Sequence, residues 1–365
     1  MIRNAPVQVQ NVVVCGAFNP STPEELIPSG LHVERDEAPT SLFLDRALRR
    51  VGLSPRLGYL TRVLEQEKAH VLHSHYGAWG WRNLPAVRRT KVKHVVSFYG
   101  YEATYLVKKE PRWRDRYREL FREVDVVICE MPQMIPVVMA LGASEAQVRV
   151  NHLGVEVAGI KYVPRSWDGK GKFRVMVAGS FREKKGIPYA LMALARIRDE
   201  LRLEITLVGD ASSEARDQNE KLWIMETISQ YGLKDLVRLT GYVPYARLLE
   251  ESYSHHVFLA PSVTALDGDT EGGGLMVLVD MAASGMPIIS SIHCGIPEVV
   301  IHGSTGLLAP ERDVEAIATH IRYLAGHPDS WRQMLDAGRL RVEQEFNAQV
   351  QGGHLAEIYS QLIRQ

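Results

Sequence analysis

The stretch EGGGLMVLVDMAASGMP, residues 271–287, carries an acid at each end of a glycine-rich and hydrophobic segment. Placing the carboxylates of Glu271 and Asp280 among apolar side chains is costly unless each has strong partners. The residues that follow Glu271 are Gly272, Gly273, Gly274 and Leu275. These glycines allow close backbone approach, and their amides near a helix start could hold a diphosphate.

Two carboxylates separated in this way suit the hydroxyl groups at both ends of a nucleoside-diphosphate sugar. If the helix starts near Leu275, Asp280 lies about 8 Å along its axis at about 1.5 Å per residue. One acid would bind the ribose and the other the transferred sugar. The structural alternative is that Glu271 caps the helix and Asp280 makes a hydrogen bond in the core.

The turn GSFREKKG, residues 179–186, contains the cations Arg182, Lys184 and Lys185 between an expected strand and an expected helix. A helix N-terminus already favours an anion, so added cations oppose the helix dipole unless an anion is bound. The pattern favours a phosphate site over its alternative, a solvated basic turn.

In the first half of the chain, HSHYG (73–77) and SFYGYE (97–102) end expected strands. His73, His75 and Tyr99 could therefore face a ligand, although a histidine with a purely structural role is an equal alternative for each. The pair Asp267 and Asp269 is spaced like a metal-binding acid-x-acid motif, but its glycine-rich context favours a turn. We therefore assign no metal to it.

These residues are positioned by short apolar runs that alternate with longer helical patterns. The first-half runs are NVVVC (11–15), HVLHSH (70–75), HVVSF (94–98), VDVVICE (124–130) and VRVNHLG (148–154). The second-half runs are FRVMVAGS (173–180), LEITLVGD (203–210), VRLTGYV (237–243), HVFLAPS (256–262) and PIISS (287–291). Helices are expected at 188–200 and 219–232. This alternation predicts an α/β fold with parallel sheets, in which ligands bind beyond the carboxyl ends of the strands.

We expect two Rossmann-like domains that face each other across a cleft. The predicted ranges are 1–160 for the N-terminal domain, 161–172 for a linker and 173–345 for the C-terminal domain. Residues 346–365 are predicted to form a helix that returns to the first domain.

The composition excludes several classes of protein. The 365 residues carry 43 basic and 43 acidic side chains, so a generally basic nucleic-acid binder is not expected. The three cysteines show no metal or disulfide spacing, and no apolar run approaches the about 20 residues that cross a bilayer. A cytoplasmic protein is expected, and the charge balance leaves peripheral membrane contact open.

The second half resembles the retaining GT-B glycosyltransferases of family four (group one), in particular the exopolysaccharide branch of the colanic-acid type. The matching segments are EKKGIPYAL, LVGD, GYVPYARLLEESYSHHVFLAPSVTALDGDTEGG, DMAASGMPIISSIHCGIPEVV and GSTGLLAPERD, in order over about residues 173–313. HSHYG, SFYGYE and NHLGVE extend the resemblance into the first half.

The resemblance implies that Lys185 binds the donor phosphates. The family's partner arginine falls on Ser180, and Arg182 in the same turn could replace it. The loop from Gly241 to Val243 falls where the family holds the uridine.

The resemblance also implies that Glu271 is the first acid of the family's acid pair and meets the donor sugar. The family usually leaves seven residues between its two acids, and that spacing reaches Val279, whereas anchoring on ASGMP assigns the second acid to Asp280. We adopt that anchor because Gly285 and Pro287 then match the family, with one extra glycine in the loop.

The first domain departs further from the family. Tyr99 stands where the family has a histidine, and Gly16 in CGAFNP (15–20) is the only candidate for its first glycine-rich loop. Gly16, His75 and Tyr99 are the predicted acceptor-side residues.

The resemblance implies a metal-independent, retaining transferase without a cofactor. It would move a hexose from a nucleotide sugar, with a UDP-sugar expected, to a glycan or lipid-linked acceptor in exopolysaccharide or cell-envelope glycan synthesis. One alternative is a catalytically weak nucleotide-sugar binding module. The other is a dinucleotide-dependent oxidoreductase, although no G-x-G-x-x-G follows a first strand.

Overall fold

The computed structural model describes residues 10–15, 30–33, 55–272 and 276–364. The chain divides into two compact units that are each formed by more than one segment. The first comprises Met1–Glu130, Ile135–His152 and Ala348–Gln365, and the second comprises Met131–Met134 and Leu153–Asn347.

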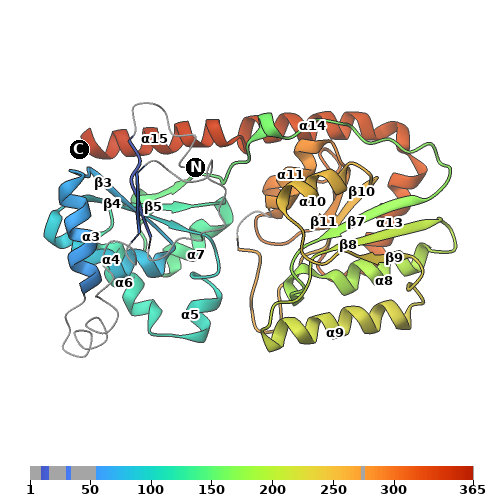
Figure 1. Ribbon diagram of the computed structural model, residues 1–365, viewed down its shortest axis with the longest axis horizontal. Coiled ribbons are helices and arrows are strands. Elements are labelled where there is room, and N and C mark those ends of the chain that lie inside the picture. Colours follow the sequence, from blue (N-terminus) through green and yellow to red (C-terminus); the bar gives the residue numbers. More distant parts are fainter. Residues whose placement is uncertain (1–9, 16–29, 34–54, 273–275, 365) are drawn as a thin grey trace. The chain divides into compact units, whose positions relative to one another are not determined.

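The second unit is built on a six-stranded parallel sheet (Figure 1). Its strands are β7 (Phe173–Ala178), β8 (Leu203–Val208), β9 (Val237–Leu239), β10 (Val257–Ala260), β11 (Ile288–Ser291) and β12 (Leu307–Ala309). Strands rich in Val, Ile and Leu that are buried on both faces require helices on both sides. The helices are α8 (Ile187–Ile197), α9 (Ala215–Gln230), α10 (Tyr245–Ser252), α11 (Met276–Ser284), α12 (Ile296–Val299), α13 (Val314–Gly326) and α14 (Trp331–Glu345).

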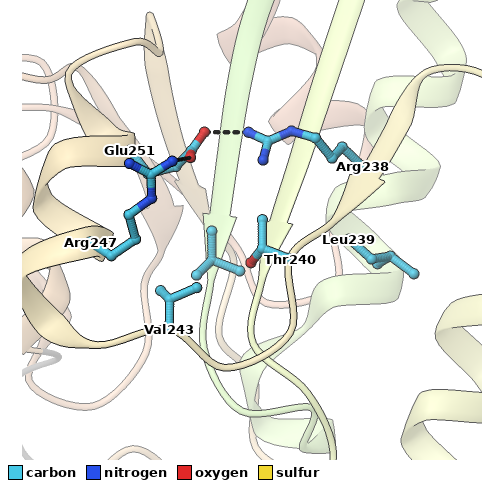
Figure 2. A pocket seen from close by; sticks show the side chains of 7 residues that line it. Arg238, Leu239, Thr240, Val243, Arg247 and Glu251 are labelled. Atoms are coloured by element: carbon cyan, nitrogen blue, oxygen red, sulfur yellow. Dashed lines mark hydrogen bonds and ion pairs between the residues drawn. The ribbon is translucent and has the colours of Figure 1, made fainter.

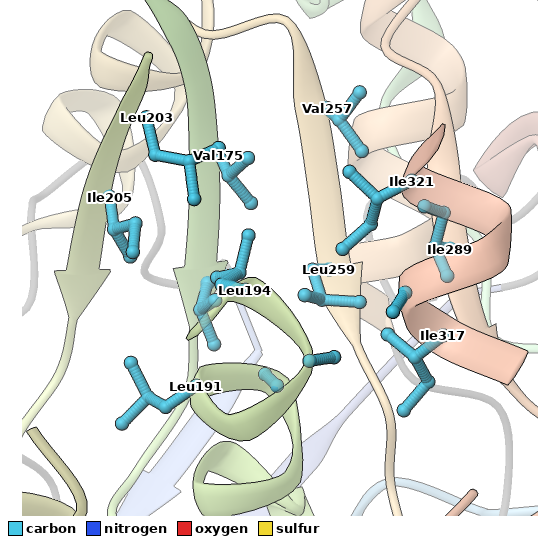
Figure 3. Packing of buried hydrophobic residues seen from close by; sticks show 14 of the residues in the cluster. Val175, Leu191, Leu194, Leu203, Ile205, Val257, Leu259, Ile289, Ile317 and Ile321 are labelled. Carbon is cyan, nitrogen blue, oxygen red and sulfur yellow. The ribbon is translucent and has the colours of Figure 1, made fainter. Parts of the chain in front are cut away.

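Two hydrophobic clusters fix this sheet between its helices. In one, Leu191 and Leu194 of α8 and Ile321 of α13 pack with strand residues such as Val175 and Leu259 (Figure 3). The other cluster joins α11 and α14 to further strand side chains. Burying this many aliphatic side chains is the main favourable contribution to the stability of such a unit.

The strand order creates a switch point at the centre of the sheet. The order is β12-β11-β10-β7-β8-β9, so the chain runs outward from β7 to β9 and then returns to β10 beside β7. In open parallel sheets, ligands bind at the carboxyl ends of strands where the winding direction reverses. The loops after β7 and β10 therefore define the expected binding position within this unit.

The first unit contains a four-stranded parallel sheet of the same kind. Its strands, in spatial order, are β3 (Val71–His75), β4 (Lys93–Phe98), β5 (Val126–Cys129) and β6 (Val148–Val150). Its helices are α3 (Pro55–Gln66), α4 (Gly77–Thr90), α5 (Tyr105–Lys109), α6 (Trp113–Glu123), α7 (Ile135–Ala140) and α15 (Ala348–Arg364). Leu355 and Leu362 of α15 pack against Val95, Val126 and Ile128 of this sheet.

The predicted strands all correspond to strands of the structure, usually with shorter bounds. The run 11–15 forms β1 (Val13–Cys15), which pairs in parallel with β2 (Leu31–Val33) as a separate two-stranded sheet. The three-residue strands β2 and β12 were not predicted.

The predicted linker at 161–172 lies within the second unit. The Val163 N–H donates to the Ser284 carbonyl at 3.0 Å, and the Arg165 N–H donates to the Gly285 carbonyl at 2.9 Å. The buried Arg165 guanidinium also donates to the Ser284 carbonyl at 2.7 Å. A segment without periodicity is therefore held by the end of α11, which a local sequence pattern does not reveal.

Candidate functional site

A pocket of about 410 Å³ opens at the carboxyl edge of the second unit's sheet. Its lining residues are Ala178, Gly179, Ser180, Lys185, Val208, Gly209, Tyr242, Val243, Leu248, Glu271, Met276 and Val277. They end β7 and β8, follow β7, β8, β9 and β10, or lie on α10 and α11. The pocket therefore lies at the position that the switch point predicts.

Two glycines allow the loops of this edge to approach each other closely. Gly209 has φ of +135°, and a Cβ there would lie 1.9 Å from the Gly179 carbonyl oxygen. Gly186 has φ of +61°, and its Cβ would lie 2.0 Å from the Pro261 carbonyl oxygen. A side chain at either position would push apart the strand ends that form the pocket.

An ion pair between Lys185 and Glu271 forms part of the pocket wall. Lys185 Nζ donates to Glu271 Oε2 at 2.9 Å, and Ser262 Oγ donates to Oε1 at 2.8 Å. The side chains are 19% and 5% exposed, respectively. Both carboxylate oxygens thus have a donor, while the ammonium keeps an exposed part from which it can bind an anion.

The neighbouring acids of this loop are also matched by cations. Lys184 Nζ donates to Asp269 Oδ1 at 3.2 Å and to the Thr270 carbonyl at 2.8 Å. Asp267 accepts the backbone N–H of Asp269 at 2.9 Å, which is the geometry of an Asx turn. The loop around Asp267 and Asp269 is therefore a turn that ion pairs brace. Within the described ranges, no three His, Cys, Asp or Glu side chains are placed to hold a metal ion.

Arg182, the predicted second phosphate ligand, makes a different contact. Its Nε lies 3.4 Å from Oδ2 of the buried Asp217 on α9. Ser180, which occupies the family's arginine position, lines the pocket, whereas Arg182 does not belong to the lining set. Arg182 would have to leave Asp217 to reach a ligand in this pocket.

Asp280 is buried on α11, one turn beyond the pocket residues Met276 and Val277. Tyr245 of α10 donates its phenol O–H to Asp280 Oδ1 at 2.8 Å. Burial raises the pKa of Asp280 to about 6, and the hydrogen bond from Tyr245 opposes that rise. Tyr245 is thus a protein partner of Asp280, and binding of a ribose stays a prediction.

The remaining donor-side predictions fall on backbone loops. Val243 lines the pocket, and the Gly241 carbonyl accepts the N–H of Gly209 at 2.9 Å. Gly272 is buried with φ of +72°, so a glycine is needed there. Gly273, Gly274, Leu275 and the acceptor-side Gly16 lie outside the described residues.

A smaller hollow of about 290 Å³ adjoins the pocket through the shared lining residues Val208 and Val243. Figure 2 shows Glu251 between the side chains of Arg238 and Arg247 in this hollow. Glu251 accepts a hydrogen bond from Arg238, and Arg247 Nη1 donates to Glu250 at 2.6 Å. Both guanidinium groups are thus engaged by carboxylates, and we assign no ligand to this hollow.

The first unit gathers polar side chains at the ends of β3, β4 and β5. His75 Nδ1 lies 2.5 Å from the phenol oxygen of Tyr99, so the structure brings these two predicted residues together. Glu102 accepts the N–H of Tyr99 at 2.9 Å.

Two buried glutamates beneath this edge were not selected as site residues. Burial raises the pKa of Glu102 to about 7 and that of Glu130 to about 8, and each carboxyl keeps one oxygen without a hydrogen-bond partner. Glu130 directly follows β5 and Glu102 lies in the loop after β4, so their positions after strands were the available signal. Their burial and mutual proximity depend on the tertiary fold.

Comparison with known proteins agrees with this geometry. The sequence profile described as Glycosyl transferases group 1 matches residues 165–341, and the profile described as Glycosyltransferase Family 4 matches residues 7–158. The amylovoran biosynthesis glycosyltransferase AmsK of Erwinia amylovora is 29% identical over 272 residues, covering 74% of this chain and 64% of the relative. The Escherichia coli protein WcaL, named for colanic acid biosynthesis, is 26% identical over 327 residues, covering 86% of this chain and 77% of the relative. The chain thus matches less than two thirds of the length of AmsK.

Solved structures share the fold. Sucrose-phosphate synthase from Thermosynechococcus elongatus has a TM-score of 0.71 and 22% identity, covering 84% of this chain and 77% of that chain. Anabaena HepE in complex with UDP and glucose has a TM-score of 0.70 and 16% identity, covering 86% of this chain and 82% of that chain.

The two Rossmann-like units and these neighbours define a protein of the GT-B fold class. The chain belongs to the glycosyltransferases of group 1 and family 4, in the branch with relatives named for exopolysaccharide biosynthesis. No helix among the described residues is long and apolar enough to span a membrane.

Proposed function

We propose that the chain transfers a hexose from a nucleotide sugar, expected to be a UDP-sugar, to a glycan or lipid-linked acceptor with retention of configuration. The observation that carries this proposal is the Lys185–Glu271 ion pair in the pocket at the switch point of the second sheet. It offers a cation for a diphosphate and a carboxylate for sugar hydroxyls within one hydrogen bond of each other.

The ion pair suggests how donor binding proceeds. A diphosphate in the pocket competes with Glu271 for the Lys185 ammonium, because phosphate oxygens are also strong charge-assisted acceptors. Glu271 stays held by Ser262 Oγ at 2.8 Å and gains capacity to accept a hydrogen bond from a hydroxyl of the donor sugar. While the pocket is empty, the Lys185–Glu271 ion pair leaves neither charge unpaired.

Catalysis then comes from positioning and from stabilisation of the leaving diphosphate. Negative charge develops on the diphosphate as the glycosidic bond breaks, and a fixed ammonium nearby lowers the energy of that state. The proposal assigns this role to Lys185, with Arg182 as a second cation if it exchanges Asp217 for the ligand. The backbone amides of residues 272–275 and a ribose contact of Asp280 complete the proposed donor site.

The acceptor is proposed to bind the first unit near His75 and Tyr99. The names of the relatives AmsK and WcaL refer to exopolysaccharides, which supports a growing glycan or its lipid-linked form as the acceptor. The proposal includes no cofactor and no metal, because Lys185 would supply the charge that a divalent ion would otherwise provide.

Incubating the protein with a panel of nucleotide sugars and glycan acceptors tests the proposal. The expected result is a product that keeps the anomeric configuration of the donor sugar, measured by proton NMR of the anomeric signal. Turnover is expected to survive EDTA. An inverted product contradicts retention, and activity that EDTA abolishes and manganese restores contradicts metal independence. Binding without any product would favour a nucleotide-sugar binding module.

A further inference from the structure

A buried histidine links three neighbouring loops of the second unit. Glu271 follows β10, His293 follows β11 and Glu311 follows β12, and these strands are adjacent in the sheet. The side chain of His293 is 1% exposed. Its Nδ1 lies 2.7 Å from Glu311 Oε1, and its Nε2 lies 3.2 Å from the backbone nitrogen of Glu271. Both ring nitrogens therefore contact groups at the edge of the sheet that carries the pocket.

The chemistry of these two partners fixes the protonation of the ring. A backbone N–H can only donate, so Nε2 of His293 is the acceptor and carries no proton. Burial raises the pKa of Glu311, but hydrogen bonds from Thr264 and His293 outweigh it and leave the pKa below its ordinary value. The carboxylate is thus ionised and can only accept. A neutral His293 is therefore protonated on Nδ1, which donates to Glu311.

Contacts on both sides hold this ring in place. Glu311 is anchored by Thr264, whose N–H donates to Oε2 at 2.7 Å and whose Oγ1 donates to Oε1 at 3.2 Å. Arg312 Nη1 also lies 3.2 Å from Glu311 Oε2. On the other side, the backbone of Cys294, next to His293, has φ of +45°, which is uncommon for a residue other than glycine. Such a conformation persists where the surrounding structure over-determines it.

The contact with His293 positions the backbone of Glu271, whereas Lys185 and Ser262 hold its carboxylate. The next residue, Gly272, has φ of +72°, so the chain turns directly after this N–H. His293 does not belong to the lining of the pocket. A diphosphate that draws Lys185 away from Glu271 therefore leaves the backbone contact intact.

We propose that His293, oriented by Glu311, is a positioning residue that fixes the Glu271 backbone and thereby aligns the Glu271 carboxylate with the donor sugar. The tautomer and the backbone contact stand on the geometry, whereas the effect on the sugar rests on the proposed transferase function. Because only an unprotonated Nε2 can accept a hydrogen bond, protonation of the ring releases the Glu271 N–H.

The groups around the ring determine the pH at which this release occurs. Burial lowers the pKa of His293, but Cys294 and Glu311 raise it more, so the pKa lies above its ordinary value of 6.5. The carboxylate of Glu271, the acid on the other side of the contact, is paired with Lys185. The contact is therefore complete well above the pKa of the ring and is lost as the pH falls through it.

Nitrogen-15 NMR of the full chain tests the positioning without any substrate. At about pH 8.5, the His293 ring should be mainly protonated on Nδ1. On acidification, the Glu271 backbone amide signal should shift with the same midpoint as the ring. His293→Gln should abolish this titration, because its amide can donate to Glu311 and accept from Glu271 without titrating. A ring mainly protonated on Nε2, or a Glu271 signal that does not follow the ring, overturns the proposal.

Calorimetry tests the effect on the donor. The probes are UDP-glucose, or the UDP-hexose that binds best in the nucleotide-sugar panel, and UDP itself. His293→Ala should weaken binding of the UDP-sugar about threefold to tenfold, the range for one neutral hydrogen bond, and binding of UDP less than about twofold. His293→Gln should recover most of the loss. An equal loss for both ligands overturns the orienting role, because a general disturbance of the pocket affects both.

His320→Ala is the matched control, because Nε2 of this second histidine lies 3.0 Å from the Leu308 carbonyl of β12 in the same unit. It should leave both affinities unchanged.

The pH dependence separates the ring from other groups. In the unmodified protein, affinity for the UDP-sugar should fall about threefold to tenfold as His293 is protonated. This part of the fall should be missing in His293→Gln, which retains any contribution from Asp280, whose pKa is about 6. Equal pH dependence in both proteins overturns the orienting role. If no nucleotide sugar binds, the proposed function fails, while the NMR result still decides how His293 positions Glu271.

Discussion

The two units place polar side chains at the same kind of sheet edge but treat charge in opposite ways. In the second unit, Lys184 and Lys185 are paired with Asp269 and Glu271 across loops that follow β7 and β10. In the first unit, the corresponding edge has neutral imidazoles and phenols above two buried glutamates whose pKa values burial raises.

This difference matches the chemistry that each edge is proposed to serve. A diphosphate carries charge, and a site built from ion pairs can exchange one anion for another without exposing an unpaired ion. A glycan acceptor offers uncharged hydroxyls, for which neutral donors and acceptors in fixed directions are sufficient. The sheet edge of the second unit thus pairs its charges, whereas that of the first unit keeps its groups uncharged, although both belong to parallel sheets of the same kind.

The charged edge is tested most strongly by Lys185→Met. Loss of the ammonium should weaken binding of a nucleoside diphosphate by about 2–3 kcal/mol, the upper range for a hydrogen bond to a charged group. Isothermal titration calorimetry with UDP measures it. Lys184→Met is the matched control, since Lys184 is engaged by Asp269 and the Thr270 carbonyl and should affect affinity much less. Equal affinity in the Lys185 variant and the unmodified protein would remove Lys185 from the site.

The neutral edge is tested by the pH dependence of stability. Burial raises the pKa of Glu130 in the folded state to about 8, against an ordinary value of 4.5. Between these pH values the folded state therefore binds more protons than the unfolded state. Stability should therefore fall as pH rises from about 4.5 to about 8. Glu130→Gln should remove part of this fall and raise the free energy of unfolding at pH 8 by roughly 1–3 kcal/mol.

Chemical denaturation at pH 5 and pH 8 measures this effect. The variant and the unmodified protein should differ less at pH 5, where the glutamate is protonated in the folded state. A variant that is less stable than the unmodified protein at pH 8 would show that the ionised carboxylate has a stabilising partner.

Asp280 lies between the two cases, because it is an acid of the charged unit with a raised pKa. If it binds ribose hydroxyls, Asp280→Asn should weaken UDP binding by about 1–2 kcal/mol. The loss should nearly vanish with a nucleotide that lacks the 2′- and 3′-hydroxyls. In contrast, Glu271→Gln should weaken binding of the nucleotide sugar more than binding of UDP. If Asp280→Asn lowers thermal stability but leaves the binding of every nucleotide unchanged, Asp280 is a structural acid that accepts the hydrogen bond of Tyr245.

The smallest expected effect is that of Tyr99→Phe, which removes the hydroxyl that lies 2.5 Å from Nδ1 of His75. Acceptor-dependent turnover should fall by a factor that corresponds to about 0.5–1.5 kcal/mol, with donor affinity unchanged. Steady-state kinetics with varied acceptor and calorimetry with the donor separate the two. An equal loss of donor affinity would contradict an acceptor-side role.

Local patterns were sufficient for the fold class and for selecting the loops that line the pocket of the second unit. Alternating apolar runs predicted the parallel strands, because period and length are properties of a short window. The rule that ligands bind at carboxyl ends of strands selected the loops of Lys185 and Glu271, and the structure places both in one pocket. The prediction of two Rossmann-like domains is confirmed by the fold.

The partners of these residues were beyond any local pattern. Lys185 meets Glu271 across 86 positions, Asp280 meets Tyr245 across 35, and His73 meets Tyr359 across 286. The packing of residues 161–172 on the end of α11 was missed for the same reason. Burial and pKa follow from everything that surrounds a side chain, and that surrounding is assembled from distant segments. The residue types at the site were therefore set in the sequence, whereas their charge states and hydrogen-bond directions were decided by the tertiary structure.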